Sequence, residues 1–303
     1  LKITRGAYVG YTATPFANVL ANTSDSDNSL YPQNFIYALD RPSGYFGAEE
    51  IFGRDLIHGE TSVDSPDEGL DMVRYIPEID EKKLRHPSGK SERLAWDAPS
   101  MGDVPSLRRA VQYFILASSA RRKRGDGKDS TMLIHTTMFV DPQIKMSETV
   151  KEIVKEFKSK TAQKDSAYLS ELEALWNDES ETVPAEGFPH LKSIDFGSLL
   201  GIFPQLNGHE DLGVVVDNGM SDDRLKYDKN NPRVVIVIGG NTLSRGLTLN
   251  GLVVSYFLRT SKMDDTLLQM GRWFGYRNGY EDLPRLWMNK DTEQDFRYLA
   301  QLE

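Results

Sequence analysis

Residues 234–238 form the uninterrupted apolar run VVIVI, which a glycine pair at 239–240 follows directly. Because no polar residue breaks the run, neither side of such a strand is suited to face water. Strands buried on both faces are typical of parallel sheets that helices cover on both sides. This segment therefore predicts a chain of the α/β class, and the glycine pair predicts a tight exit of the backbone from the strand.

The rest of the chain beyond residue 106 alternates between strand and helix patterns. Strands are expected at 131–140, 213–217, 252–258 and 285–288, and 213–217 is expected to be an interior strand like 234–238. Helices are expected at 107–124, 147–158, 167–176, 264–274 and 292–302. This alternation predicts a parallel sheet with helices on both faces.

The first third of the chain has a different texture. Residues 6–11 are apolar and predict a strand that stops before Pro15. Between 22 and 105, Ser, Asp, Asn, Pro and Gly are clustered and apolar stretches such as 35–39 are short, which predicts an irregular insertion. We therefore divide the chain into parts 1–21, 22–105 and 106–303.

Composition excludes several classes of function. The formal charge of -9 means that any nucleic acid must be held by a local basic groove. The absence of Cys excludes disulfides and thiolate metal sites and fits a reducing cytoplasm, and the five His residues are too scattered for a metal cluster. No apolar run reaches the roughly 20 residues of a membrane span, so no membrane partner is expected. Since the sequence begins with neither Met nor a secretory signal, we expect it to start inside a longer gene product.

Three segments carry recognisable motifs: YVGYTATPFA at 8–17, VVIVIGGNTLSRGLTL at 234–249 and LLQMGRWFGYR at 267–277. In this order they resemble the signature motifs of superfamily 2 helicases, and they are most similar to the Z1-domain family of helicase-like ATPases. The resemblance implies a RecA-like fold, with 1–21 ending a first lobe, 22–105 as an insertion and 106–303 as a nearly complete second lobe.

The resemblance also implies ligands and partners. These are ATP and Mg²⁺ bound mainly by a first lobe, DNA, and a separate nuclease in a restriction or phage-defence system. Thr12, Ala13 and Thr14 would couple the lobes, while nucleotide or nucleic-acid contacts would come from Gly240, Ser244, Arg245, Gly246, Thr248 and Gln269. Thr248 departs from the pattern, since many helicases have Asp there, and this puts a ribose contact in doubt.

Two arginines are the candidate catalytic residues. Phosphoryl transfer needs positive charge against the transferring oxygens, and the planar guanidinium supplies it in bidentate form. Arg272 and Arg277 are therefore expected to reach a γ-phosphate between the lobes, with Arg277 as the finger by family analogy. The interval between the two arginines is longer than usual in this motif, and the interval from Gln269 to Gly271 is shorter.

Each motif also has a purely structural interpretation. The arginines could pair with Asp264, Asp265 or Glu281, and Thr12 and Thr14 could form a strand-end turn. The aromatic residues Trp273, Phe274 and Tyr276 could stack on a base, although packing is commoner. The basic run 121–124 could follow a phosphate backbone, although it also suits the last turn of a helix.

Two further patterns are weaker. GKS at 89–91 lacks the preceding glycine and strand of a phosphate loop. Asp67 with Glu81 and Lys83 fits the written form of a metal-dependent nuclease motif, but the paired strands of that motif are not apparent. A non-catalytic scaffold that docks a nuclease, and less strongly a Mg²⁺-dependent nuclease, thus remain alternatives to a DNA-dependent ATPase.

Overall fold

In the computed structural model, the described residues are 9–11, 35–37, 39–40, 42–53, 69–206, 212–217, 225–240, 248–258, 271 and 274–300. Their strands are β1 (Tyr45–Phe46), β2 (Val73–Tyr75), β3 (Ser130–His135), β4 (Leu212–Asp217), β5 (Val234–Gly239), β6 (Leu252–Phe257), β7 (Gly275–Tyr276) and β8 (Arg285–Met288). Their helices are α2 (Ala48–Phe52), α3 (Glu78–Leu84), α4 (Lys90–Ala95), η1 (Met101–Asp103), α5 (Pro105–Lys123), α6 (Val140–Ala162), α7 (Ser166–Thr182), η2 (Ala185–Gly187), α8 (Phe196–Leu200), α9 (Phe203–Leu206) and α12 (Lys290–Ala300).

Six strands form one sheet in the order β2-β8-β6-β3-β5-β4, and every pair of neighbours in it is parallel. Every residue of β5 is buried, which confirms the prediction from the run at 234–238. The α/β class is therefore confirmed, and a parallel sheet flanked by helices is consistent with a RecA-like fold.

The prediction that 213–217 is an interior strand was wrong. In the described part of the sheet, β4 pairs with β5 and ends the strand order, and its four middle residues are half-buried. An apolar run shows that the faces of a strand are covered, but it carries no information on whether both of its hydrogen-bonding edges are occupied.

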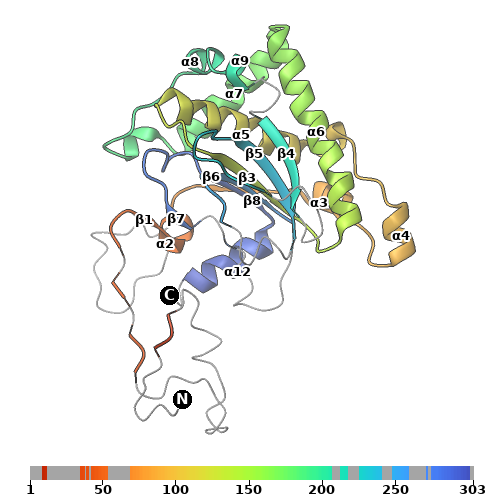
Figure 1. The fold of residues 1–303 in the computed structure, drawn as a ribbon, viewed down its shortest axis with the longest axis horizontal. Coiled ribbons are helices and arrows are strands. Elements are labelled where there is room, and N and C mark those ends of the chain that lie inside the picture. The colour runs from red at the N-terminus through yellow and green to blue at the C-terminus, as the bar shows by residue number, and fades with distance from the viewer. Residues whose placement is uncertain are drawn as a thin grey trace.

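Successive residues of β5 point to two separate cores, because side chains alternate across a strand. Val234, Ile236 and Ile238 pack with apolar residues of α5, α6, α7, α8 and α9. Val235 and Val237 pack on the other face with residues of α2 and α12, where Figure 1 shows those two helices lying together. Helices therefore cover both faces of the sheet.

The helices expected at 107–124, 147–158, 167–176 and 292–302 are present with different ends, whereas the helix expected at 264–274 falls outside the described residues except at 271 and 274. α6 begins at Val140, so the strand expected at 131–140 ends at His135. α7 continues to Thr182, beyond the expected end at 176, because its last turns place the buried Glu179 against basic side chains. No helix in the described ranges combines the length and apolar composition that a bilayer span requires.

The described part of 22–105 is more regular than its composition predicted. It contains β1, α2, β2, α3, α4 and η1, and β2 joins the main sheet through parallel pairing with β8. A three-residue strand with Arg74 at its centre has no local signature, because its stability comes from that pairing. At 9–11 the chain forms no strand, and Tyr11 is 88% exposed. The division of the chain at 21 and 105 stays a prediction.

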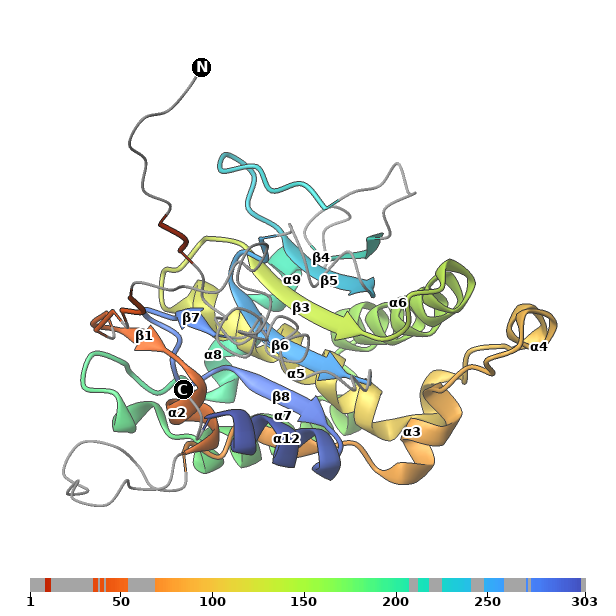
Figure 2. The same ribbon diagram turned by 90° about the horizontal axis from the view of Figure 1, so that it is seen from below.

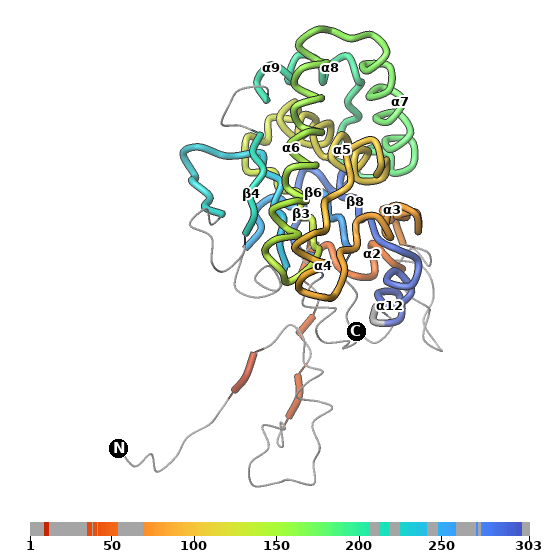
Figure 3. Tube along the Cα trace, turned by 90° about the vertical axis from the view of Figure 1, so that its right-hand side faces the viewer, coloured from red at the N-terminus to blue at the C-terminus, as the bar shows by residue number. Residues whose placement is uncertain are grey.

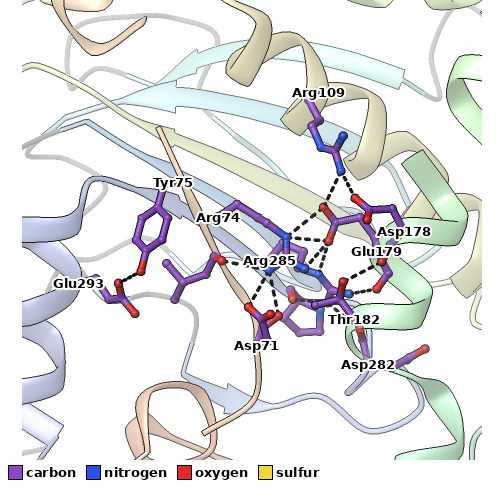
Figure 4. A network of polar contacts seen from close by, with 12 residues as sticks. Asp71, Arg74, Tyr75, Arg109, Asp178, Glu179, Thr182, Asp282, Arg285 and Glu293 are labelled. Atoms are coloured by element: carbon purple, nitrogen blue, oxygen red, sulfur yellow. Dashed lines mark hydrogen bonds and ion pairs between the residues drawn. The ribbon is translucent and has the colours of Figure 1, made fainter. Parts of the chain in front are cut away.

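A buried ionic network fixes α7 to the edge of the sheet (Figure 4). Arg285 on β8 donates to the Glu179 carboxylate at 2.8 Å, and Arg74 on β2 donates to the same carboxylate at 2.6 Å. Burial alone would raise the pKa of Glu179, but the hydrogen bond from Arg74 and the charge of Arg285 lower it below its usual value. The network thus attaches β2, from the first third of the chain, to β8 and α7.

Candidate functional site

Gly240 stands where the buried strand β5 ends. A Cβ atom added at this position would lie 2.1 Å from the carbonyl oxygen of Thr137, so only glycine fits against this stretch of backbone. The predicted role of Gly240, a tight exit from the strand, agrees with this packing. The chain therefore leaves β5 at the carboxyl end of the sheet.

The chain directly after β3 forms the neighbouring part of this end. His135 is the last residue of β3, and its Nε2 lies 3.2 Å from the carbonyl oxygen of Gly240. The His135 ring packs 5.1 Å from the ring of Phe257, the last residue of β6. Gln143 of α6 donates from Nε2 to the Thr137 carbonyl oxygen at 2.6 Å. The carboxyl ends of β3, β5 and β6 are thus joined by side chains.

His135, Thr137 and Gln143 were not predicted from the sequence to be part of a site. The available signal was the sequence His135-Thr136-Thr137 directly after an apolar strand, because polar residues at the carboxyl ends of parallel strands commonly line ligand sites. The strand prediction had extended over them to residue 140, and that hid the signal.

Arg277 follows β7 and is buried, with 7% of its surface exposed. Its guanidinium donates from Nη1 to the Tyr276 carbonyl oxygen at 3.0 Å and from Nη2 to the Phe274 carbonyl oxygen at 3.3 Å. Burial lowers the pKa of Arg277, and the neighbouring Tyr280 partly opposes that shift. The side chain is thus turned inward in this conformation.

The neighbours of Arg277 place it at the amino end of the sheet. Its carbonyl oxygen accepts from Tyr280 N at 2.9 Å, and the guanidinium of Arg121 lies 4.0 Å from the centre of the Tyr280 ring. Arg121 in turn donates to Ser130, the first residue of β3, and to the Gly251 carbonyl, directly before β6. Figure 2 shows β1 and β7 on the side where the strands begin.

The structure therefore does not bring Arg277 and Gly240 together. Since the strands are parallel, the residue after β5 and the residues before β3 and β6 lie at opposite ends, separated by about 20 Å for six-residue strands. Thr248 is exposed and lies shortly before β6, on the same side as Arg277. Thr12, Ala13, Thr14, Ser244, Arg245, Gly246, Gln269 and Arg272 fall outside the described residues.

The structural alternatives can be compared with these contacts. Glu281, one suggested partner of Arg277, accepts from His190 at 2.9 Å and from Gly279 N at 2.9 Å. Asp264 and Asp265, the other two suggested partners, fall outside the described residues. In the basic run, Arg121 pairs with Asp126 and Arg124 with Asp282, each at 2.6 Å. These pairs favour the structural interpretation of the basic run.

The aromatic residues near Arg277 divide into two groups. Phe274 is partly buried and packs against the core on the α2 and α12 face. Tyr276 is 55% exposed, and its ring meets that of Tyr45 edge to face with centroids 6.0 Å apart. Packing thus accounts for Phe274, whereas Tyr276 presents an accessible ring. Trp273 falls outside the described residues.

The two weaker sequence patterns lie on helices. Lys90 begins α4, and Glu81 to Lys83 lie on α3 rather than on a strand. The Glu81 carboxylate accepts from Arg85 and, at 3.0 Å, from Asn289, so its contacts connect α3 to the end of β8. Asp67 is outside the described residues, and within them no cluster of metal-ligating side chains occurs.

A small cavity of about 120 Å³ lies beside the carboxyl end of the sheet. His86 and Trp96 line it from the segment that carries α3 and α4, here called the arm (residues 78–96). Thr136 and Thr137 after β3 and Leu258 after β6 line it from the sheet. The cavity is thus adjacent to the Gly240 turn and remote from Arg277.

Comparison with known proteins gives one match. The family model described as the Z1 domain matches residues 106–303, more than half of the chain. No curated protein and no solved structure matches the chain.

Proposed function

Because the chain belongs to the Z1 domain family, we propose that it is the second-lobe part of a helicase-like, DNA-dependent ATPase. This motor would act in the cytoplasm, in a restriction or defence system in which a separate nuclease cuts the DNA. The first lobe would hold most of the ATP and the Mg²⁺, because residues 1–303 contain no phosphate loop of their own.

The observation that supports this proposal best is the position of the second motif. The run VVIVI is the fully buried strand β5, and the chain leaves it through Gly240 at the carboxyl end of a parallel sheet. In open α/β sheets, ligands bind outside the carboxyl ends of the strands. Residues 244–246, which follow Gly240 in the second motif, are therefore the part of this lobe that we assign to nucleotide or DNA contact.

The arginines would supply positive charge to the transferring phosphoryl group when the lobes close. For Arg277 this requires a rearrangement, because its guanidinium donates to the carbonyl oxygens of Tyr276 and Phe274. Closure would have to replace both hydrogen bonds by contacts with phosphate. Arg272 would act from the same motif, five residues earlier.

Substitution of the arginines in the complete motor, first lobe included, tests this assignment. If Arg277 is the finger, Arg277→Ala lowers kcat of ATP hydrolysis by about 10³-fold or more. Arg277→Lys should restore little, since lysine lacks the planar fork. Arg272→Ala is the parallel variant, and an equal loss in both would mean that the two act together.

The burial of Arg277 favours a second candidate function, a RecA-like scaffold that docks the nuclease without hydrolysing ATP. In that case Arg277→Ala would leave both ATP hydrolysis and DNA cleavage by the partner unchanged, apart from a loss of stability. The chain 1–303 by itself should hydrolyse ATP negligibly under the motor proposal, and robust turnover by the purified chain would refute it.

A further inference from the structure

We propose that the cavity between the arm and the carboxyl end of the sheet is a binding site for a single pyrimidine base that carries phosphate. The inference rests on the proposed DNA-dependent function and adds to it a base-contacting site. Figure 3 shows α4 of the arm lying against α6, and Pro142 and Met146 of that helix line the cavity. It lies at the end of the sheet where ligands of α/β proteins bind.

The size of the cavity restricts the ligand to one ring. A cavity of 150 Å³ in another protein accommodates benzene. The volume here, about 120 Å³, is smaller still, which limits a bound base to one six-membered ring and excludes the fused rings of a purine. Sites for larger small molecules are typically at least about 300 Å³.

The aromatic wall is held in place before any ligand binds. The His86 ring meets Trp96 edge to face at 6.3 Å and Phe139 edge to face at 5.6 Å. The Arg93 guanidinium lies 3.6 Å from the centre of the Phe139 ring and donates to the Ser88 carbonyl oxygen. Bases stack readily on such preformed aromatic surfaces.

The cavity also has polar groups that a base could satisfy. The Thr136 hydroxyl is buried and has no hydrogen-bond partner among the described residues, which is a costly arrangement unless a ligand or water binds. The Nδ1 of His86 lies 2.7 Å from the Pro87 carbonyl oxygen. In the neutral ring Nδ1 is therefore the donor and Nε2 an acceptor. The pyrimidine edge, which carries carbonyl and N–H groups, matches such a set.

Charge distinguishes a nucleotide from an uncharged ring. Between residues 82 and 93 the arm has five basic residues and only one acidic residue, Glu92, in a chain of net charge -9. Lys82 is paired on the surface with Glu78, and such a pair is weak enough to exchange for phosphate, whereas Arg85 is half-exposed and donates to the buried Glu81. Segment 82–93 is thus the local basic surface that an acidic protein needs to hold a nucleic acid, and its Arg85 lines the cavity, while Glu78, Asp80 and Glu81 precede it in the arm.

The opposite side of the arm has the reverse charge. A groove of about 500 Å³ between the arm and α6 is lined by the carboxylates of Asp97, Asp141, Glu148 and Glu152. Lys145, its basic residue, donates to the Leu94 carbonyl oxygen at 2.9 Å and to that of Trp96. This groove would repel phosphate, so a nucleotide strand is directed to the cavity side.

The test compares the binding of single-stranded oligothymidylate with that of an abasic oligonucleotide of the same length. We expect the wild-type protein to bind the thymidylate roughly tenfold more tightly, as one stacked base would produce. Trp96→Ala should abolish this preference and Thr136→Val should reduce it several-fold. Leu94→Ala is the matched control, because it lies on the same arm and Lys145 contacts both residues only through their carbonyl oxygens.

Charge is tested separately from base recognition. Lys90→Glu should weaken binding of both oligonucleotides while the preference for thymidylate persists, and Lys151→Glu on α6 is its control. Thymidine monophosphate identifies the source of the base. Competition by the oligonucleotide alone indicates single-stranded DNA, and equal competition by the monophosphate indicates a free nucleotide.

Equal affinity of the wild-type protein for thymidylate and abasic oligonucleotides would overturn the inference, as would an unchanged preference in both Trp96→Ala and Thr136→Val. Thermal melting of each variant separates loss of binding from loss of folding. If the base preference is missing while DNA still stimulates ATP hydrolysis by the complete motor, only this inference fails. If hydrolysis is insensitive to the arginine substitutions while the base preference is present, the proposed motor fails instead.

Discussion

The Nε of Arg285 lies 2.8 Å from the carboxylate of Glu179, and each of these two side chains is only 1% exposed. Together with Arg74 they form a buried ionic cluster that connects α7, β8 and β2 (Figure 4). Removal of one member of such a cluster leaves a buried charge without compensation, which costs far more than the loss of a surface pair.

Glu179→Ala should therefore lower the free energy of unfolding by about 3–5 kcal/mol. The control is Lys82→Ala, which removes the exposed pair with Glu78 and should cost less than about 1 kcal/mol. Urea denaturation of both variants and the wild-type protein gives the comparison. Similar small losses in both would mean that water reaches the cluster in solution.

The same carboxylate predicts a dependence of stability on pH. Because the pKa of Glu179 is lowered in the folded protein, the unfolded chain takes up the proton first as the solution becomes acidic. Its contribution to stability is fully present above the unfolded pKa of about 4.3 and is lost as pH falls through the lower folded value. Unfolding free energies of wild type and Glu179→Gln, measured from neutral to acidic pH, should start to approach each other as pH falls below about 4.3. A constant difference over that range would contradict the assignment.

Gly240→Ala should be poorly tolerated, because the new Cβ would lie 2.1 Å from the Thr137 carbonyl oxygen. We expect a loss of about 1–3 kcal/mol in unfolding free energy as the backbone shifts, and a loss of ATP hydrolysis in the complete motor. Gly127→Ala, where a Cβ meets no atom within 4 Å, is the matched control and should stay close to wild type. A stable Gly240→Ala protein would show that the loop after β5 can move away from Thr137.

The separation of Arg277 from Gly240 predicts additive effects. Substitutions more than about 7–10 Å apart without shared partners add to within about 0.5 kcal/mol. The loss in free energy of unfolding of the double variant Gly240→Ala with Arg277→Ala, measured by urea denaturation, should thus equal the sum of the losses in the two single variants. The stability losses of His135→Phe and Gly240→Ala should not be additive, because His135 Nε2 lies 3.2 Å from the Gly240 carbonyl oxygen. A strongly non-additive loss for Gly240→Ala with Arg277→Ala would contradict the separation of these two residues.

Much of the fold could be predicted from the sequence. The apolar runs of β5, β6 and β8 and the periodic patterns of α5, α6 and α7 identified the core elements, because burial imposes a period of two or 3.6 on side chains. β2 was missed because three residues with a central arginine carry no period, and its stability depends on pairing with β8. The tight exit of the backbone at Gly240 was predicted, whereas the position of His135 and Thr136 at the same carboxyl end of the sheet was not.

By itself the sequence determined the class of the protein: a buried apolar strand among alternating helices allows little except a parallel sheet covered on both faces, and its motifs identified the Z1 domain family. The tertiary structure decided the order of the strands, the edge position of β4 and the distance between the two motif residues Gly240 and Arg277. The reason is physical. Periodicity records which side chains are buried, whereas strand order and the end of the sheet at which a loop emerges depend on hydrogen bonds between residues far apart in the chain.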